Sequence, residues 1–232
     1  MNGASTSAMP RFKPAELLGA LNSVERKNAP EYLWIEGDRS LLRLRPRVSI
    51  VGTRKASADG LSRTARLTRE LVANDVVIVS GLARGVDTAA HRSCMESGGR
   101  TIAVLGGPLE SIYPPQNADL QRLIASKHLV VSQFAPGTPI RPTQFPRRNR
   151  TMALLTDATV IIEAGEGSGT LSQGWEALRL GRALFILKSV AEDSGLKWPA
   201  EMLGYGAEVL SDTAQILARL PLGMDESISL AL

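Results

Sequence analysis

Cysteine is nearly absent from this 232-residue chain, which carries a single thiol at Cys94. One cysteine excludes an intrachain disulfide framework and fits a reducing cytoplasm. Val86, Ala90 and Cys94 share one face of an expected helix, which predicts a small buried thiol. No apolar run approaches membrane-spanning length, and the opening MNGASTSAMPRFKP lacks the apolar core of a signal peptide. We therefore expect a cytoplasmic protein with no membrane partner.

A strong charge of one sign is also lacking. The net charge of +4 comes from 27 basic and 23 acidic residues, which is too mild to imply nucleic acid by itself. The sequence has no G-x-x-x-x-G-K-[ST] motif, and its opening loop VGTRKAS is not G-x-G-x-x-G, so a P-loop NTPase and an ordinary dinucleotide enzyme are disfavoured. No cluster has metal-ligand spacing, and no G-x-S-x-G elbow is present. We expect neither a metal nor a cofactor.

Short β-branched runs dominate the chain from Val48 onward. They are nearly continuous in apolar residues, which is typical of strands buried on both faces of a parallel sheet. The runs are VSIVG, VVIVSG, TIAVLGG, LVVSQF, TVIIEA and ALFIL. Helical stretches alternate with them, so the pattern predicts a doubly wound, mostly parallel α/β sheet in a single domain. We expect a flexible lead-in over 1–14, a core over 15–220 and a tail over 221–232.

The two ends of the core give weaker patterns. AELLGALNSVERKN has helical periodicity, and YLWIEG is typical of a short strand. In LRLRPR, leucine and arginine alternate, which predicts a half-exposed strand with a solvated basic face. After Lys188 we expect a loop, a short helix around Pro199–Leu203 and a final helix near Ser211–Leu220.

Glycine-rich loops follow several expected strands, at the edge of the sheet where ligands bind in open parallel folds. In SGLARGVD, Gly81 and Gly85 permit close backbone approach or a positive φ. Arg84 stands where a guanidinium could meet a phosphate in bidentate fashion. Asp87 can cap the next helix, and a satisfied contact between Asp87 and His91 is expected there rather than an acid–base pair.

Three arginines crowd into QFPRRNRT: Arg147, Arg148 and Arg150, with Asn149 between them. The proline suits the first turn of a helix, where cations oppose the macrodipole. An anion is therefore a physical reason for the arginines. Phe145 adds an aromatic face, the pairing used to hold single-stranded nucleic acid. The alternative is a solvated basic turn with a buried phenylalanine.

The segment GEGSGTLSQGWEA, which ends at Ala177, joins an expected strand to an expected helix through a glycine turn. A glycine turn before a helix often cradles phosphate, because backbone amides and the helix dipole both favour an anion. The loop could serve an enzyme, a small-ligand sensor or a nucleic-acid binder.

Five motifs in order, IVGTRKAS, SGLARGVDTAAH, AVLGGPLESIYPPQN, APGTPIRPTQFPRRNR and EAGEGSGTL, resemble the DNA-processing protein A family, also called DprA or Smf. The resemblance covers about Tyr32 to Leu187. It implies an extended Rossmann-like domain of the wider Lonely-guy-like superfamily. The implied function is to bind single-stranded DNA as a homodimer and to hand it to a RecA-type recombinase during natural transformation, without catalysis.

The motifs and the resemblance together indicate a nucleic-acid and phosphate site with no catalytic residue. In such a site phosphate contacts supply affinity, and stacking supplies a sequence-tolerant hold. The expected binding residues are Gly52, Arg54, Ser80, Gly81, Arg84, Gly85, Phe145, Arg147, Arg148, Asn149, Arg150, Ser168, Gly169 and Thr170.

The sequence also departs from the family. Many members carry an N-terminal helical domain and a C-terminal winged-helix-like domain, and we expect this chain to be too short for either. The family usually has Ser-Glu where this chain has Ser132-Gln133, and Thr-Ala where it has Gln173-Gly174. These departures keep a second hypothesis open, in which the same site senses a small nucleotide.

A third hypothesis is a nucleoside-monophosphate phosphoribohydrolase that resembles the Lonely-guy enzymes. Their motif, P-G-G-x-G-T-x-x-E, supplies a glutamate that takes part in hydrolysis. In this chain Gln173 stands at that place, and an amide cannot act as a general base. Glu176, one helical turn on, and Glu163, at the strand end, do not restore the motif. Hydrolysis therefore ranks below both binding hypotheses.

Overall fold

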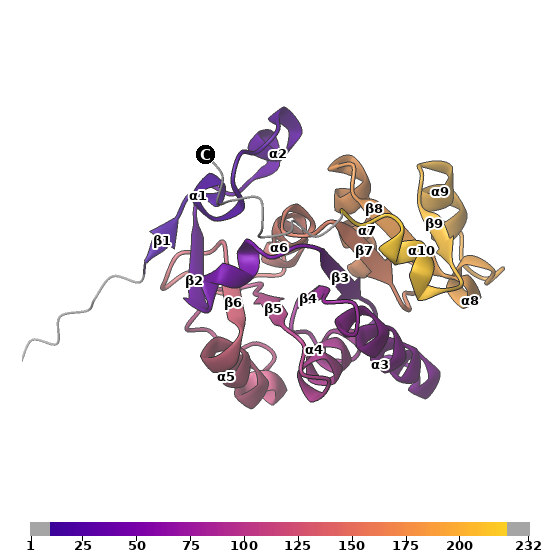
Figure 1. The fold of residues 1–232 in the computed structure, drawn as a ribbon, viewed down its shortest axis with the longest axis horizontal. Helices are drawn as coiled ribbons and strands as arrows, with labels where there is room; N and C mark the ends of the chain where they lie inside the picture. Colours follow the sequence, from indigo (N-terminus) through magenta and orange to yellow (C-terminus); the bar gives the residue numbers. More distant parts are fainter. Residues whose placement is uncertain (1–9, 222–232) are drawn as a thin grey trace, which may run out of the picture.

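The protein forms one twisted sheet with helices on both faces (Figure 1). The structure is a computed structural model that describes residues 10–221. Over that range the strands lie in the order β1-β2-β6-β5-β4-β3-β7-β8-β9, and the pairs β1–β2 and β2–β6 are antiparallel whereas all other pairs are parallel. The prediction of a doubly wound, mostly parallel α/β domain is confirmed. The strands are β1 Arg11–Phe12, β2 Leu33–Gly37, β3 Arg47–Val51, β4 Val77–Ser80, β5 Thr101–Val104, β6 Leu129–Ser132, β7 Ala158–Ile161, β8 Ala183–Leu187 and β9 Glu208–Leu210.

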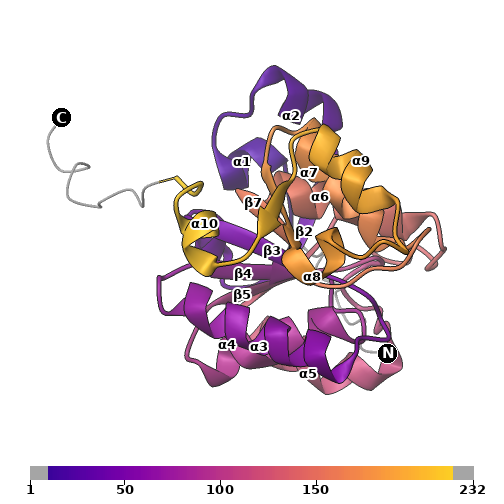
Figure 2. The ribbon, with the colours of Figure 1, turned by 90° about the vertical axis from the view of Figure 1, so that its right-hand side faces the viewer.

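The helices divide between the two faces of the sheet (Figure 2). Helices α3, α4 and α5 cover one face, and α6, α7 and α9 cover the other together with the N-terminal α1 and α2. Within residues 10–221, no helix has both the length and the apolar content needed to cross a bilayer. The helices are α1 Pro14–Leu18, α2 Ser23–Asn28, η1 Arg39–Leu42, α3 Ala58–Val72, α4 Val86–Glu96, η2 Pro115–Asn117, α5 Ala118–Lys127, α6 Gln144–Leu154, α7 Thr170–Arg179, α8 Lys188–Ala191, α9 Trp198–Gly204 and α10 Thr213–Leu217.

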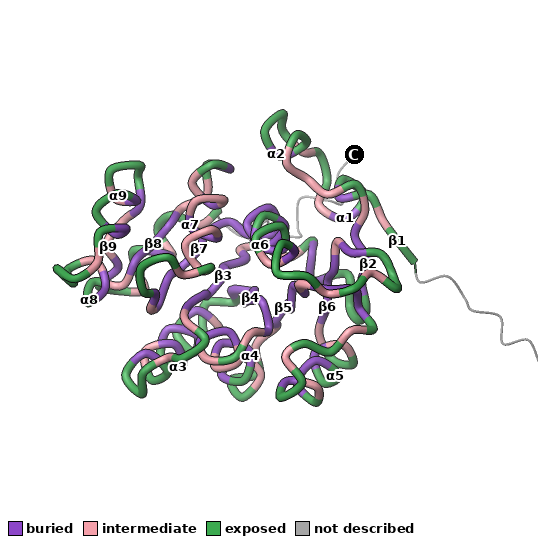
Figure 3. The backbone as a smooth tube through the Cα atoms, turned by 180° about the vertical axis from the view of Figure 1, so that it is seen from behind, coloured by how far each residue is buried: buried purple, intermediate pink, exposed green. Residues whose placement is uncertain are grey.

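The centre of the sheet is buried on both faces (Figure 3). Along β4, Val77 and Val79 pack into the apolar cluster on one face, whereas Ile78 packs with Leu71 and Cys94 into the cluster on the other. Each of these five residues is fully buried. Fully burying one such aliphatic side chain stabilises a fold by about 1.5–3 kcal/mol. The continuous apolar runs therefore form the inner strands because neither face of these strands meets water.

Several predictions outside the central sheet are wrong in detail. AELLGALNSVERKN forms two short helices, α1 and α2, because the chain turns at Gly19 with φ +80°. Part of the expected lead-in is structured, since Arg11–Phe12 pair with β2, while residues 1–9 and the tail 222–232 lie outside the described residues. The expected loop after Lys188 begins with α8, and β9 adds a parallel edge strand at Glu208–Leu210.

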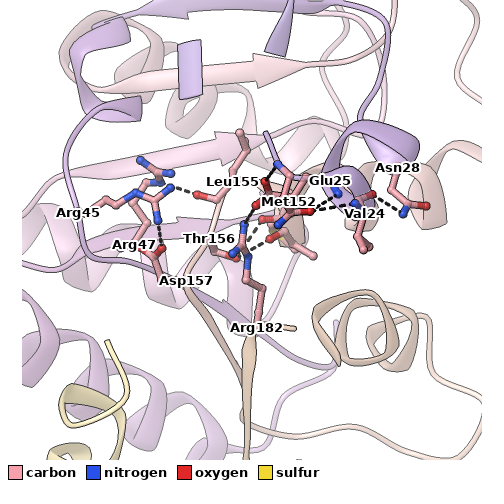
Figure 4. Close-up of polar contacts among 12 residues, drawn as sticks. Val24, Glu25, Asn28, Arg45, Arg47, Met152, Leu155, Thr156, Asp157 and Arg182 are labelled. Atoms are coloured by element: carbon pink, nitrogen blue, oxygen red, sulfur yellow. Dashed lines mark hydrogen bonds and ion pairs between the residues drawn. The ribbon is translucent and has the colours of Figure 1, made fainter. Parts of the chain in front are cut away.

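The Leu/Arg alternation of LRLRPR is not a strand. Leu42 ends η1, Arg43 and Arg45 are exposed, and Arg47, the first residue of β3, is buried in a polar cluster with Asp157 (Figure 4). The Arg47 guanidinium, 1% exposed, donates to the carbonyls of Leu42 and Leu155. Asp157 accepts the Arg47 amide at 2.8 Å and pairs with Arg45. Burial lowers the pKa of Arg47 to about 10, and the Asp157 charge opposes that shift.

A second ion pair in this region joins α2 to the core. Arg182, the residue before β8, pairs with Glu25 of α2 (Figure 4). Glu25 also accepts the Asn22 amide at 2.8 Å and so completes the cap of α2. The short helix is therefore held in place by its neighbours rather than by its own length.

Candidate nucleic-acid interface

A cavity of about 480 Å³ opens at the carboxyl ends of β3, β4 and β7. Because β3 and β7 are parallel neighbours, the loops that follow them meet. The Thr53 amide donates to the Glu163 carbonyl at 2.7 Å, and the Thr170 hydroxyl donates to the Gly52 carbonyl at 3.0 Å. The first turn of α6 closes one side. Eight of the predicted site residues line this cavity: Gly52, Arg54, Phe145, Arg148, Asn149, Ser168, Gly169 and Thr170.

Glycines let the first two loops lie against each other. Gly85 has φ +75°, and a β-carbon there would lie 2.3 Å from the Thr53 carbonyl oxygen. A β-carbon at Gly52 would lie 2.5 Å from the side chain of Val86, at the start of α4. Both positions therefore need glycine for reasons inside the chain.

Arg148 is a buried residue that connects neighbouring segments through hydrogen bonds, and it is not an exposed cation. Only 6% of it is exposed. Its Nη1 donates to the carbonyls of Gly81 and Val104, the latter at 2.9 Å, and its Nε donates to Asn149 Oδ1 at 2.9 Å. The guanidinium thus joins the ends of β4 and β5 to α6 while it lines the cavity.

The buried charge of Arg148 lies opposite that of Asp87. Burial lowers the pKa of Arg148, and the Asp87 charge opposes that shift. Burial likewise raises the pKa of Asp87, opposed by Arg148 and by the Ala83 amide, which donates to Asp87 Oδ2 at 3.3 Å. The expected contact between Asp87 and His91 is not formed, because His91 Nδ1 bonds Thr101 Oγ1 at 2.7 Å instead.

Asn149 ties the glycine loop to α6. Its Nδ2 donates to the Gly169 carbonyl at 3.1 Å and to Ser172 Oγ at 2.6 Å, while its Oδ1 accepts from Arg148. With both ends of its amide engaged, Asn149 fixes the loop that precedes α7. Arg148 and Asn149, the two central residues of the R-R-N-R motif, therefore build the site before any ligand arrives.

Arg54 and Tyr113 both contact Phe145, and of these three residues Arg54 and Phe145 line the cavity. The Phe145 ring packs on Gly106, where a β-carbon would lie 2.6 Å from it. The exposed Arg54 holds its guanidinium carbon 5.3 Å from the Phe145 centroid, and the Tyr113 ring lies 5.4 Å from Phe145 on centroids. Tyr113 is 43% exposed. Tyr113 was not among the residues predicted from the sequence, although a tyrosine in LGGPLESIYP, the segment after an expected strand, could have indicated it.

The loop before α7 is open to the outside. A β-carbon at Gly165, Gly167 or Gly169 would meet nothing within 4 Å, and of these three only Gly167 has a positive φ. Crowding by the chain itself therefore does not explain Gly165 and Gly169. The loop leads into the N-terminus of α7, where backbone amides and the helix dipole favour an anion.

The carboxylates weighed for hydrolysis lie outside the cavity lining. Glu163 accepts the Ser57 amide at 3.0 Å at the start of α3, and Glu176 pairs with Arg150 and Arg179. Gln173 does line the cavity and is fully buried. Its Nε2 makes long contacts to two hydroxyls of the sheet, and its Oε1 has no partner among the described residues.

The remaining predicted residues lie elsewhere. Ser80 is buried and donates to the Ile50 carbonyl at 2.7 Å, and Arg84 is exposed beside the cavity without lining it. Arg147 and Arg150 lie on another flank of α6, in a separate hollow. Within residues 10–221 no group of His, Cys, Asp and Glu side chains could hold a metal ion.

Comparison with known proteins points to one family. A family model described as DNA recombination-mediator protein A matches residues 14–221. The DNA processing protein DprA of Streptococcus pneumoniae is 36% identical over 191 residues, which are 82% of this chain and 67% of that protein. The chain spans about two thirds or less of the length of the curated relatives that it matches.

Solved structures agree with the sequence comparison. The X-ray structure of Streptococcus pneumoniae DprA is 34% identical and superposes with a TM-score of 0.81, over 92% of this chain and 75% of the other. A structure of DNA processing protein A from Helicobacter pylori, reported for its single-stranded DNA binding mode, is 28% identical with a TM-score of 0.74. It covers 91% of this chain and 94% of that one.

Proposed function

The chain belongs to the DNA recombination-mediator protein A family, and on that basis we propose that it binds single-stranded DNA across the cavity at the carboxyl ends of β3, β4 and β7. The bound strand is protected without being cleaved and is passed to a RecA-type recombinase. The single-strand binding of the Helicobacter pylori relative supports the choice of ligand. The hand-off and a homodimeric assembly rest on the family resemblance.

The observation that carries this proposal is the group formed by Arg54, Phe145 and Tyr113 beside the open glycine loop. Stacked aromatic rings hold bases of any sequence, at about 1–3 kcal/mol for each base. A cation next to the rings neutralises the backbone charge of the same strand. The combination fits a flexible strand with accessible base faces, whereas a duplex keeps its bases stacked on one another.

Each residue then has a distinct part in binding. Arg54 is exposed and makes the phosphate contact, whereas the buried Arg148 keeps the loops in register. The amides at the start of α7 take a second phosphate, which Gly165 and Gly169 allow to come close because they carry no side chain. Binding requires no proton transfer and no bond cleavage.

A nucleotide-sensing role is the second candidate. It is favoured by Gln173, whose side chain lines a cavity of about 480 Å³ and whose Oε1 has no hydrogen-bond partner within residues 10–221. A buried carbonyl oxygen without a partner is costly unless a donor reaches it, and a nucleobase carries such donors. A nucleotide that copurifies with the protein and is identified by mass spectrometry would favour this role.

The proposed function is tested by comparing single-stranded and double-stranded DNA as competitors for a labelled thymidine oligomer over a series of salt concentrations. We expect the single strand to compete more strongly at every concentration. We also expect its apparent affinity to fall as salt rises, because binding releases counterions from the DNA backbone and this release becomes less favourable at higher salt concentration. Equal competition by the duplex would contradict the proposal, and release of free base from a nucleoside monophosphate would instead revive the hydrolase.

A further inference from the structure

A second hollow, of about 380 Å³, lies on another flank of α6. It is bounded by the end of α2, the start of β2, the segment after β6 and the first turns of α6. Because Trp34 of β2 pairs with Ser132 at the end of β6, this hollow opens at the same edge of the sheet as the first cavity. The two are separated by one helix, about 10 Å across.

The side chains of α6 divide between the two spaces by helical spacing. Phe145, Arg148 and Asn149 lie three and four residues apart and line the first cavity, whereas Arg147 and Arg150 lie three apart and line the second hollow. Residues three or four apart share a helix face. The basic motif therefore serves two surfaces, not one groove.

Aromatic rings gather in the second hollow. Tyr32, Trp34 and Phe134 line it, in a chain that has only 3 Trp, 3 Tyr and 4 Phe. The Arg147 guanidinium carbon lies 5.4 Å from the Phe134 centroid. Tyr32 and Trp34 meet edge to face at 6.3 Å. This pairing of arginine with aromatic rings is the one found in the first cavity.

The charge of the hollow also suits a phosphate. Among the described residues that line it, Arg147 and Arg150 face one carboxylate, Glu31. Arg150 is 47% exposed in its side chain and pairs with Glu176 at 3.3 Å, while Glu176 also pairs with Arg179. Arg150 can thus turn to a phosphate without leaving Glu176 unpaired.

We propose that this hollow is a second nucleotide subsite for the same DNA strand, which crosses the first turn of α6 from one space to the other; this inference rests on the proposed function. A base stacks on the Arg147 guanidinium over Phe134, and Arg150 holds an adjoining phosphate. Only a strand long enough to pass over α6 reaches both spaces.

The test uses thymidine oligomers of about four and about 15 nucleotides, the range that single-strand sites span. Arg147→Ala, at an exposed position, should weaken binding of the long oligomer about ten-fold, as expected for one lost stacking contact, and leave the short oligomer unchanged. Arg122→Ala on α5 removes the same charge from a 65% exposed side chain and serves as the matched control.

Four outcomes are decisive. Loss confined to the long oligomer supports the second subsite. An equal loss for both lengths, or for neither, overturns it while the proposed function stands. If the wild-type protein binds neither oligomer, the proposed function fails first, and this inference falls with it. Tyr32→Leu, which keeps an apolar side chain at a half-buried position, repeats the comparison without changing charge.

Discussion

The guanidinium of Arg148 lies against the backbone of Gly81, where a β-carbon would stand 2.0 Å from Nη1. The position of this nitrogen is fixed, because it donates hydrogen bonds to the carbonyls of Gly81 and Val104. Gly81 has no positive φ, so the requirement for glycine comes from the arginine alone. The second strand-end loop and the basic helix α6 are therefore fitted to each other.

Gly81→Ala should destabilise the protein, because the added methyl group displaces a buried and hydrogen-bonded guanidinium. Overpacking of this kind costs about 1–3 kcal/mol, and urea unfolding measures the loss. Gly204→Ala is the matched control, since a β-carbon at the end of α9 meets nothing within 4 Å. An equal stability of the two variants would show that Arg148 has an alternative position.

Gly169→Ala should leave the stability of the protein nearly unchanged and weaken its binding of DNA. The added β-carbon meets nothing within 4 Å and φ is −58°, so the free energy of unfolding should change by less than about 1 kcal/mol. Binding of single-stranded DNA should weaken, because the methyl group stands where a phosphate approaches the first turn of α7. Unchanged affinity in a titration against a labelled oligomer would show that no phosphate binds at this loop.

Arg54 and Phe145 should contribute to binding through different forces. Arg54→Ala removes one phosphate contact and should lower the slope of log affinity against log salt by about one. Phe145→Leu keeps the slope and loses stacking, with affinity falling by about 1–3 kcal/mol. Isotherms at several salt concentrations separate the two effects, and a change of slope in Phe145→Leu would argue against stacking.

His91 should make stability depend on pH. Burial lowers the pKa of this fully buried imidazole to about 3, below its ordinary value of 6.5 in the unfolded chain. The unfolded state therefore binds the additional proton, and stability is lost as pH falls from about 6.5 toward 3. At pH 5 the loss from this residue should be about 2 kcal/mol.

His91→Gln separates that loss from other titrations. The variant is less stable at neutral pH, because the hydrogen bond to Thr101 changes, but its unfolding free energy should fall less between pH 7 and pH 5 than that of the wild type. The two proteins share every other titrating group, including the half-buried His128. Parallel pH profiles in urea unfolding would show that His91 does not titrate in this window.

The sequence was informative where burial decided the structure. The six apolar runs from Val48 onward became β3 to β8, because strands buried on both faces need continuous apolar residues. LRLRPR misled, because the partner of Arg45 and Arg47 is Asp157, more than a hundred residues away. No local pattern reports such a long-range ion pair.

The sequence predicted which residues belong to the candidate site, but it did not predict the direction in which their side chains point. Eight predicted residues line one cavity, since the carboxyl ends of parallel strands meet at one edge. The pattern could not tell that Arg148 is buried and Arg150 is exposed. The direction of each side chain depends on the contacts of α6 with β4, β5 and α7. Whether the predicted residues bind DNA stays a prediction.

Photo-crosslinking tests the central claim most directly. A thymidine oligomer that carries 5-iododeoxyuridine is bound to the protein and irradiated, and the crosslinked peptides are identified by mass spectrometry. The account predicts crosslinks to peptides that contain Phe145 or Tyr113, because Phe145 lines the cavity and the Tyr113 ring lies next to it. Crosslinks confined to α3 or α5, which lie on the face of the sheet opposite α6, would contradict it.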